Sequence, residues 1–555
     1  MKSQKRTNHW LRNIFMVLVL ASAGLMLAGS GSKNFEITKH LDIFSTLFRE
    51  LVVNYVDDIN VSEVMRTGID EMLESLDPYT NFISEAEIED ARFMTTGQYG
   101  GIGARVQQRG NHIMITEPYE GFPAHKAGLR PGDIILEINN QSTQGRTDAE
   151  VRTLLQGQPG TSLNMLIDRE GEEMLKSIER EVIRIANIPH HAMLDETTAY
   201  IKLTGFTRRA SREVRDAFLE LSEDNPVEAV ILDLRGNGGG LLHEAVNITN
   251  LFVDKDNLIV HTRGRLEDRT STHRTLNDPL DTEIPLVILV DRASASASEI
   301  VAGAIQDYDR GVILGHRTFG KGLVQNVLPL SYNTQLKVTV AEYFIPSGRG
   351  IQAINYAERR SDGSVYKIAD SLKVAFETRS GRVVYDGGGI DPDVEVERPE
   401  RSAVTRALQR DFMIFDYANQ FTKLHDSIPE PKDFHITNDI YDDFKRFISQ
   451  QDFSYETETE RLLRRLKNAS ESELYFNAMD AEIDRLIEIV DKEKERDLIT
   501  FRSEIEQILR EEIVSRYYYR QGRVIVSLDD DPDVDRALQL LSDREAYEVI
   551  LAGVK

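Results

Sequence analysis

The sequence predicts a multidomain α+β protein with helical segments at both ends. Near the N-terminus and again beyond residue 400, apolar residues recur every three or four positions, as on one face of a helix. Residues 97–186 carry glycines and short alternating apolar runs, which are typical of strands. Residues 187–400 alternate strand-like and helix-like runs, which favours an α/β layer with buried, nearly parallel strands. At 555 residues the chain also exceeds what one hydrophobic core serves.

Charge and composition exclude several classes of function. The net charge of −26 would repel a phosphate backbone, so nucleic acid is not expected as a partner. The chain has no cysteine, which excludes disulfides, thiolate metal sites and a cysteine nucleophile and fits an exported protein. The 12 histidines form no HExxH motif, and the doublet His190-His191 would face opposite sides of a strand. We therefore predict no metal and no cofactor.

Residues 1–30 have the layout of a secretory signal. Basic residues up to Arg12 precede an apolar stretch over 14–28, which then meets Gly29, Ser30 and Gly31. The stretch is short for a membrane span, yet its basic flank also suits an anchor whose basic end stays inside. The segment is therefore expected to be a cleaved signal peptide or a retained N-terminal membrane anchor.

Four further segments follow along the chain. A helical module is predicted over 35–95, with Phe44, Leu47 and Leu51 on one helix face and a second helix that stops before Asp77-Pro78. A β-rich domain over 97–186 has strands at HIMITE and IILEIN and a helix near 147–155. The α/β core is predicted over 187–400 and a charged helical extension over 401–555.

The β-rich segment opens with a glycine loop ahead of a strand and later contains GLRPGDIILEINN. Such a loop lets successive N–H groups converge on a carboxylate, and the adjacent strand edge can pair with an extended peptide. The segment resembles a PDZ domain, with Gly100, Gly101, Ile102 and Gly103 in the peptide-binding position. This resemblance implies that the domain binds protein C-termini.

Two stretches of the α/β segment have the residue types of a nucleophilic site. VILDLRGNGGG over 230–240 is an apolar strand that ends in glycines, whose amides can stabilise an oxyanion. ASASASEIVAGAIQDYDRGVILGHRTFGKGLVQ over 293–325 holds three serines and a lone lysine, Lys321. A serine needs a base, and a lysine serves as one only if its pKa falls from about 10.4. Taken alone, a surface lysine and a helix cap at Ser298 are the plainer interpretation.

The order of these motifs changes that interpretation. Together with YFIPSGRGIQ and DGGGIDPDVEV, they resemble the carboxyl-terminal processing proteases, tail-specific serine proteases of peptidase family S41, over about residues 35–400. The resemblance implies Ser296 as nucleophile and Lys321 as general base, with Gln325 orienting the lysine. It further implies an oxyanion hole from the N–H of Ala297 and of Gly239 or Gly240, and a supporting acidic position at Asp307.

The family resemblance implies a PDZ-containing serine endopeptidase with an α/β protease core and a Ser–Lys dyad. It would act on protein substrates with disordered or non-polar C-termini in the bacterial periplasm, free or anchored to the inner membrane by residues 14–28. The extension over 401–555 lies outside the resemblance, and its amphipathic helices suit self-association or an adaptor. The alternative is a non-catalytic PDZ-based envelope scaffold that binds protein C-termini.

Overall fold

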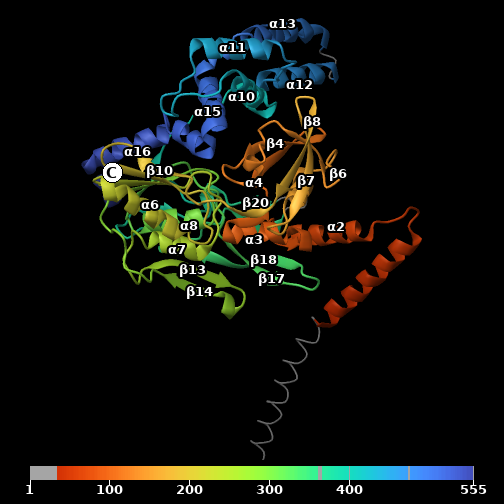
Figure 1. Cartoon of the computed structure of the whole chain (residues 1–555). Coiled ribbons are helices and arrows are strands. Elements are labelled where there is room, and N and C mark those ends of the chain that lie inside the picture. Colours follow the sequence, from red (N-terminus) through yellow and green to blue (C-terminus); the bar gives the residue numbers. More distant parts are fainter. Residues whose placement is uncertain (1–33, 360–364, 399, 473–475, 554–555) are drawn as a thin grey trace, which may run out of the picture. The chain divides into compact units, whose positions relative to one another are not determined.

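The computed structural model describes residues 34–359, 365–398, 400–472 and 476–553. The chain divides into two compact units, Met1–Pro78 and Tyr79–Lys555 (Figure 1). The signal or anchor predicted over 1–30 lies outside the described residues. In the described ranges, no helix is both long and apolar enough to cross a membrane. The helical module predicted over 35–95 is divided between the two units.

The first unit contains two helices in its described part, residues 34–54 and α2 (Val61–Glu74). Helix α2 begins where the Asn60 side chain accepts a hydrogen bond from the Glu63 amide at 3.3 Å. It ends ahead of Asp77-Pro78, as the sequence predicts.

The second unit opens with short elements that lead into a β-rich domain. A five-strand path runs in the order β3-β4-β5-β7-β8, with β6 paired to β5, so β3 is an edge strand. Helix α5 begins in a capping box between Thr147 and Glu150. The predicted strands and helix of this segment are confirmed. The elements up to the end of this domain are β1 (Asn81–Ile83), α3 (Ile88–Thr96), β2 (Gln98–Gly101), β3 (Ala104–Arg109), β4 (His112–Pro118), α4 (Pro123–Lys126), β5 (Ile134–Ile138), β6 (Gln141–Ser142), α5 (Asp148–Leu155), β7 (Ser162–Arg169), β8 (Glu172–Glu179) and β9 (Glu181–Arg184).

A six-stranded sheet forms the centre of the α/β segment, in the order β10-β11-β12-β15-β16-β23. Only β10 runs antiparallel to its neighbour, and the other pairs are parallel. Strands β12 and β15 are buried along their whole length, which confirms the predicted α/β layer. The sheet strands and the helices between them are β10 (His190–Met193), β11 (Thr198–Lys202), α6 (Ala210–Asp224), β12 (Ala229–Asp233), α7 (Leu242–Thr249), β15 (Leu286–Val290), α8 (Ala297–Asp307), β16 (Val312–Gly315) and β23 (Val394–Glu395).

The two faces of this sheet are covered by different parts of the chain. Alternate strand residues such as Leu232 and Ile288 pack with α6, α7 and α8 in the main core. The intervening residues, such as Ile231 and Leu289, pack against α16 (Pro532–Ser542) and α17 (Arg544–Ala552). The end of the predicted extension is therefore a layer of the α/β domain.

A buried charge network holds the start of α16 at the sheet. Arg235, just after β12, contacts Asp233 at 2.7 Å, Asp531 at 2.7 Å and Asp533 at 3.0 Å. Burial alone would raise the pKa of Asp233, but Lys202 and Arg235 hold it well below its usual value. Because Asp531 is the N-cap of α16, the motif LDLRGN fixes where that helix begins.

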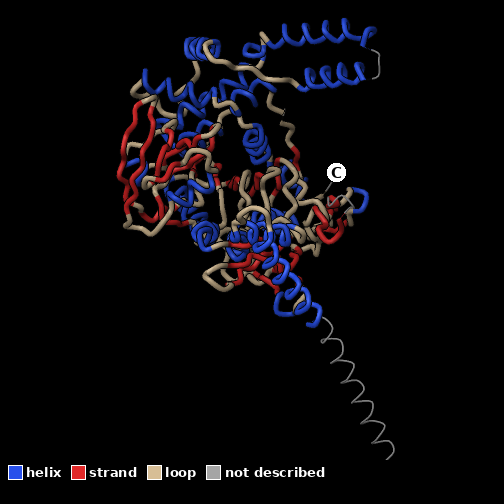
Figure 2. Tube along the Cα trace, turned by 90° about the vertical axis from the view of Figure 1, so that its right-hand side faces the viewer, coloured by secondary structure: helices blue, strands red, loops and turns tan. Residues whose placement is uncertain are grey.

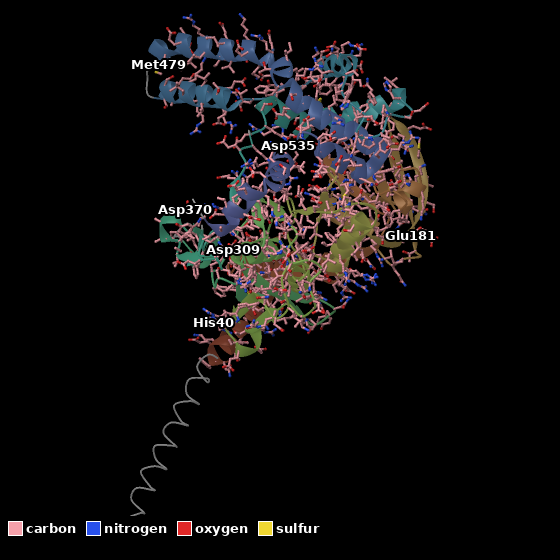
Figure 3. The ribbon with its side chains drawn as sticks, turned by 90° about the vertical axis from the view of Figure 1, so that its left-hand side faces the viewer. His40, Glu181, Asp309, Asp370, Met479 and Asp535 are labelled. Atoms are coloured by element: carbon pink, nitrogen blue, oxygen red, sulfur yellow. The ribbon has the colours of Figure 1, made fainter. Side chains whose placement is uncertain are left out.

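A second sheet and several small pairs complete the α/β segment. Strands β1 and β13 flank β18, which also pairs with β17. Asp309, labelled in Figure 3, accepts from Arg382 at 2.6 Å and so fixes the loop between β21 and β22. The remaining strands are β13 (Leu258–Gly264), β14 (Ser271–Arg274), β17 (Leu323–Pro329), β18 (Gln335–Phe344), β19 (Ile354–Arg359), β20 (Val365–Lys367), β21 (Ala375–Glu377) and β22 (Val383–Tyr385), with short 3₁₀ turns at Glu85–Glu87, Glu267–Arg269 and Asp370–Leu372.

Of the remaining helices, α9, α10, α11 and α15 form a separate core around Tyr417, Phe444 and Leu509. Helices α12 and α13 lie side by side (Figure 2), with Lys467 paired to Asp484 at 2.6 Å. These helices are α9 (Ala403–Arg410), α10 (Met413–Leu424), α11 (Asn438–Ser449), α12 (Glu458–Ser472), α13 (Phe476–Lys494), α14 (Asp497–Thr500) and α15 (Arg502–Ser527).

The docking of α17 on the sheet can be tested at Tyr547. Its buried hydroxyl accepts from the Leu286 N–H at 2.9 Å and contacts the Leu286 carbonyl oxygen at 3.2 Å. Tyr547→Phe should lower the free energy of unfolding by about 1–3 kcal/mol, because it leaves a buried N–H unpaired. Tyr547→Ala should cost about 3–5 kcal/mol, measured by urea denaturation. Tyr332→Phe, at a side chain that is 93% exposed, is the matched control. Equal stability of Tyr547→Phe and the unmodified protein would contradict this docking.

Candidate active site

The turn between β15 and α8 presents Ser296. Ser296 is the N-cap of α8 and has φ 57° and ψ −111°, a backbone conformation that is rare for residues other than glycine. Its side chain lines a cavity of about 530 Å³ together with Lys321 and Gln325. The structure therefore brings the two residues of the predicted dyad and the predicted orienting residue Gln325 to one cavity. A strained strand-to-helix turn is a known way to expose a serine hydroxyl.

The two neighbouring serines are buried and have structural contacts. The Ser294 hydroxyl donates to the Leu234 carbonyl at 2.9 Å, and the Ser298 hydroxyl donates to the Asn237 carbonyl at 2.9 Å. Both tie this turn to the loop after β12. The interpretation of Ser298 as a helix cap is wrong, because Ser296 occupies the cap and Ser298 lies inside α8.

Glu299 holds the serine turn and the lysine loop together. Its Oε2 accepts from the backbone N–H of Ser296 at 2.7 Å and of Lys321 at 2.9 Å. Its Oε1 accepts from the Thr318 hydroxyl at 2.6 Å and the Gly320 N–H at 2.7 Å. Burial raises the pKa of Glu299 to about 7, although these four donors favour the charged form.

Tyr343 makes a second link between the same two residues. Its hydroxyl donates to the Ser296 carbonyl at 3.1 Å and also contacts the Lys321 carbonyl. Burial raises the pKa of Tyr343 well above its usual value, so the hydroxyl stays a donor. The Lys321 ammonium lies 4.3 Å from the ring centroid of Tyr79. The sequence analysis missed Glu299, Tyr343 and Tyr79; the pattern Ser296-x-x-Glu299, a capping-box signature, was the signal for Glu299.

The glycines after β12 line the cavity beside Ser296. A Cβ atom on Gly239 would lie 2.9 Å from the Ser296 Cβ, so this approach requires glycine. The Gly239 N–H donates to the Asn237 side chain at 2.9 Å and is therefore not available as an oxyanion donor in this conformation. In the described part of the chain, the N–H groups of Ala297 and Gly240 have no such acceptor. Of the two glycines left open by the sequence, the structure favours Gly240.

Gln325 and Asp307 have other partners. The Gln325 amide nitrogen donates to the Leu323 carbonyl at 3.2 Å and to the Thr339 hydroxyl at 3.3 Å, which fixes its side chain at the cavity wall. Asp307 ends α8, one helix length from Ser296, and pairs with Arg349 at 2.9 Å. The structure does not bring Asp307 to the cavity.

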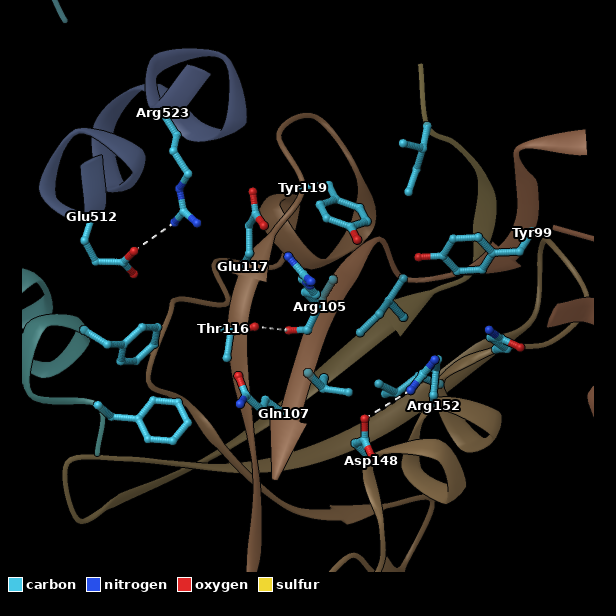
Figure 4. A pocket seen from close by; sticks show the side chains of 18 of the residues that line it. Tyr99, Arg105, Gln107, Thr116, Glu117, Tyr119, Asp148, Arg152, Glu512 and Arg523 are labelled. Carbon is cyan, nitrogen blue, oxygen red and sulfur yellow. Dashed lines mark hydrogen bonds and ion pairs between the residues drawn. The ribbon is translucent and has the colours of Figure 1, made fainter. Parts of the chain in front are cut away.

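A second cavity, of about 730 Å³, lies along the free edge of β3 (Figure 4). Of the predicted loop, Ile102 lines this cavity, whereas Gly100 and Gly101 belong to β2, which pairs with β9. Gly103 has φ 72°. The loop is held by its carbonyl oxygens, because Ile102 accepts from Ala124 at 2.7 Å and Gly103 from Tyr119 at 2.8 Å.

Helices of the C-terminal segment form the opposite wall of this cavity. They contribute the apolar side chains Phe412 and Phe415, and Glu512 and Arg523, which pair at 3.0 Å (Figure 4). Two ion pairs fasten this segment to the β-rich domain: Arg109 binds Asp416 at 2.6 Å, and Lys423 binds Glu170 at 2.5 Å. Within the described residues, no cluster of three or more His, Asp or Glu side chains could hold a metal ion.

The raised pKa of Glu299 predicts a pH dependence of stability. The folded protein keeps a proton that an unfolded glutamate, with an ordinary pKa of 4.5, releases. The proton on Glu299 therefore contributes roughly 3 kcal/mol to the free energy of unfolding. This contribution is fully present below about pH 4.5 and is lost as the pH rises through about 7. The free energy of unfolding of the unmodified protein, minus that of Glu299→Gln at the same pH, should therefore fall across this window. A difference that stays constant from pH 4 to 8 would contradict the prediction.

Models of three protein families match consecutive parts of the chain. The PDZ domain matches residues 114–169, and "Peptidase family S41" matches residues 197–358. The model described as "Probable PDZ-protease, C-terminal helical domain" matches residues 404–541. The last match covers most of the extension that the sequence analysis could not relate to a family.

The chain is also similar to curated relatives and, at low TM-scores, to solved structures. A carboxy-terminal-processing protease of Bartonella bacilliformis is 34% identical over 348 residues, 61% of this chain and 80% of the relative. A protein of Staphylococcus aureus named "Probable CtpA-like serine protease" is 32% identical over 317 residues, 56% of this chain and 62% of the relative. The photosystem II D1 C-terminal processing protease matches with a TM-score of 0.36 and 26% identity, over 63% of this chain and 86% of that chain. The peptide-bound PDZ domain of a Vibrio cholerae carboxy-terminal protease matches with a TM-score of 0.15 and 24% identity, over 16% of this chain and 99% of that chain.

The identity to the Bartonella relative extends over four fifths of its length, and the protease and PDZ models match the segments that carry the two cavities. The chain therefore belongs to peptidase family S41, as a carboxy-terminal processing serine protease with a PDZ domain.

Proposed function

We propose that the protein is an endopeptidase that recognises the C-terminal segment of its substrate in the PDZ cleft and hydrolyses a peptide bond with a Ser296–Lys321 dyad. The observation that carries this proposal is that both side chains line one cavity while Glu299 binds the backbone of both residues. Two residues from separate loops are thus held in a fixed relation, as proton transfer requires.

The reaction starts with transfer of the Ser296 hydroxyl proton to the neutral Lys321 amine. The Ser296 oxygen then bonds to the substrate carbonyl carbon, and the N–H groups of Ala297 and Gly240 stabilise the oxyanion. When the C–N bond breaks, the protonated Lys321 gives its proton to the leaving amine, which leaves an ester on Ser296. Water, deprotonated by Lys321, attacks the carbonyl carbon of this ester. The bond from that carbon to the Ser296 oxygen then breaks, Lys321 returns the proton to the Ser296 oxygen, and the new carboxyl end is released. Gln325, a neutral amide on the same wall, orients the lysine without adding charge.

The PDZ cleft supplies substrate recognition. The edge strand β3 offers backbone groups to an extended peptide, and the carbonyl contacts of Ile102 and Gly103 leave the loop N–H groups as donors for a terminal carboxylate. The apolar side chains on both walls of this cleft suit non-polar residues in the substrate tail.

We also propose that the protein is exported to the periplasm, with residues 1–30 as signal peptide or anchor. The basic residues ahead of the apolar stretch and the absence of cysteine support export. N-terminal sequencing of protein recovered from cell fractions separates the outcomes: a start beyond residue 30 means cleavage, and an intact N-terminus in the membrane fraction means an anchor. Intact protein in the cytosolic fraction would contradict export.

The dyad is tested by digestion of a disordered protein, with the products identified by mass spectrometry. Ser296→Ala and Lys321→Ala should each lower kcat by about 10³-fold or more, because each removes the nucleophile or its base. Gln325→Ala should lower it by roughly tenfold, since it affects only the orientation of the base. Exposed Ser331→Ala and Lys492→Ala are the matched controls. Cleavage by Ser296→Ala would show that another serine attacks, and cleavage by none of the proteins would favour the scaffold.

Carboxylate recognition is tested with one non-polar peptide, prepared as the free acid and as the C-terminal amide. Their Kd values for the full chain carrying Ser296→Ala are compared by fluorescence anisotropy. The amide should bind at least tenfold more weakly, about 1.4 kcal/mol, because it lacks the charge that the loop N–H groups bind. Gly103→Ala should weaken binding of the free-acid peptide, because the added Cβ atom would lie 2.5 Å from Phe122. Gly68→Ala, at a position where the added Cβ atom meets open space, is the control. Equal affinity of acid and amide would contradict this role of the loop.

A further inference from the structure

The catalytic cavity has one sign of charge. Its basic lining side chains are Lys337, Arg520 and the proposed general base Lys321, and among its described lining residues there is no Asp or Glu. This is unexpected in a chain of net charge −26. A cavity lined by one sign of charge raises the local concentration of ligands of the opposite sign.

Arg520 reaches this cavity from the C-terminal helical domain. Helix α15 is kinked at Tyr518 and Tyr519, where Tyr519 has φ 50° and ψ −149°. At this kink the Tyr519 hydroxyl contacts His125 Nε2 of the PDZ domain at 2.8 Å. Three residues beyond Arg520, Arg523 lines the PDZ cleft. One turn of α15 therefore contributes an arginine to each cavity.

The two cavities adjoin each other. Phe93 and Ile185 line both of them. A substrate held by its tail along β3 and by its scissile bond at Ser296 would pass these two residues and the adjacent turn of α15. The part of the substrate between the two sites is on the C-terminal side of the scissile bond.

Two of these basic side chains, Arg520 and Lys337, can pair with an acidic group of a substrate. Arg520 is exposed, and neither it nor Lys337 forms an ion pair with a described residue. Partial burial lowers the pKa of Arg520, and of the nearby charged groups Glu117 of β4 raises this pKa, whereas Arg105 and Arg523 lower it. Glu117 lines the PDZ cleft and does not line the catalytic cavity.

We propose that Arg520 and Lys337 are specificity determinants that select substrates with acidic side chains near the scissile bond, with Arg520 acting on the C-terminal side of that bond. This inference rests on the proposed function. An acidic substrate side chain would meet two cations that have no ion-pair partner, whereas a basic one would meet like charges.

The test uses peptides that are cut at one mapped bond and differ at one position, two residues C-terminal to that bond, where they carry Glu, Gln or Lys. The unmodified full chain should show a kcat/KM about fivefold higher for Glu than for Gln, and lower again for Lys. The preference should shrink when the salt concentration is raised from 50 to 500 mM, because salt screens exposed charges.

Variants of the enzyme test which side chain causes the preference for Glu over Gln. Arg520→Gln should abolish most of the Glu over Gln preference, measured as the ratio of kcat/KM for the two peptides. Arg520→Lys should retain the preference, and Lys337→Gln should reduce it. Arg536→Gln, at an exposed arginine of α16 outside both cavities, should leave it unchanged.

Equal kcat/KM for the three peptides, or a preference that survives both Arg520→Gln and Lys337→Gln, would overturn the inference and leave the proposed protease function intact. Failure of the unmodified protein to cut any of the peptides would overturn the proposed function, and this inference with it.

Discussion

The site depends on the buried carboxylate of Glu299. It lies in the first turn of α8, so it is fixed to the helix that carries Ser296, yet two of its four donors are backbone N–H groups of the loop that carries Lys321. The two oxygens of the ionised carboxylate have about four lone-pair sites and can accept all four bonds, which favours the charged form against the burial that raises the pKa of Glu299 to about 7. The strained backbone of Ser296 persists because such contacts hold it from both sides.

The glycine loop after β12 contacts the Ser296 turn, next to that carboxylate. Gly239 allows the loop to approach the Ser296 turn closely, and Asn237 binds the Ser298 hydroxyl through its carbonyl. At the other end of the same motif, Asp233 and Arg235 hold the N-terminus of α16. A single stretch of sequence thus connects Gly240, one of the two candidate oxyanion donors, to the last helices of the chain.

This connection changes how the C-terminal segment is understood. Helices α16 and α17 cover one face of the central sheet. Without them, the β-branched and leucine side chains of this face would be exposed to water. Of the helices before them, α9, α10, α11 and α15 form their own core. Residues of α9, α10 and α15 also line the PDZ cleft, and Arg109–Asp416 and Lys423–Glu170 connect this segment to the β-rich domain. The helical domain therefore forms part of the wall of the proposed peptide-binding cleft.

The sequence by itself determined the α/β core and the β-rich domain, because strand and helix periodicity and glycine-rich turns are local properties. The candidate dyad was identified through the resemblance of the ordered motifs to a known protease family. The order of the motifs also separated Ser296 from its neighbours. The sequence did not reveal Tyr343, the packing of α16 and α17 on the sheet, or Arg520 in the catalytic cavity. Each of these joins residues far apart in the chain: Tyr343 lies 47 positions from Ser296, and Tyr547 lies 261 positions from Leu286. The choice between Gly239 and Gly240 and the true position of Asp307 depended on hydrogen bonds across the fold. Only the tertiary structure decided them, because a contact between distant segments leaves no periodic pattern in either one.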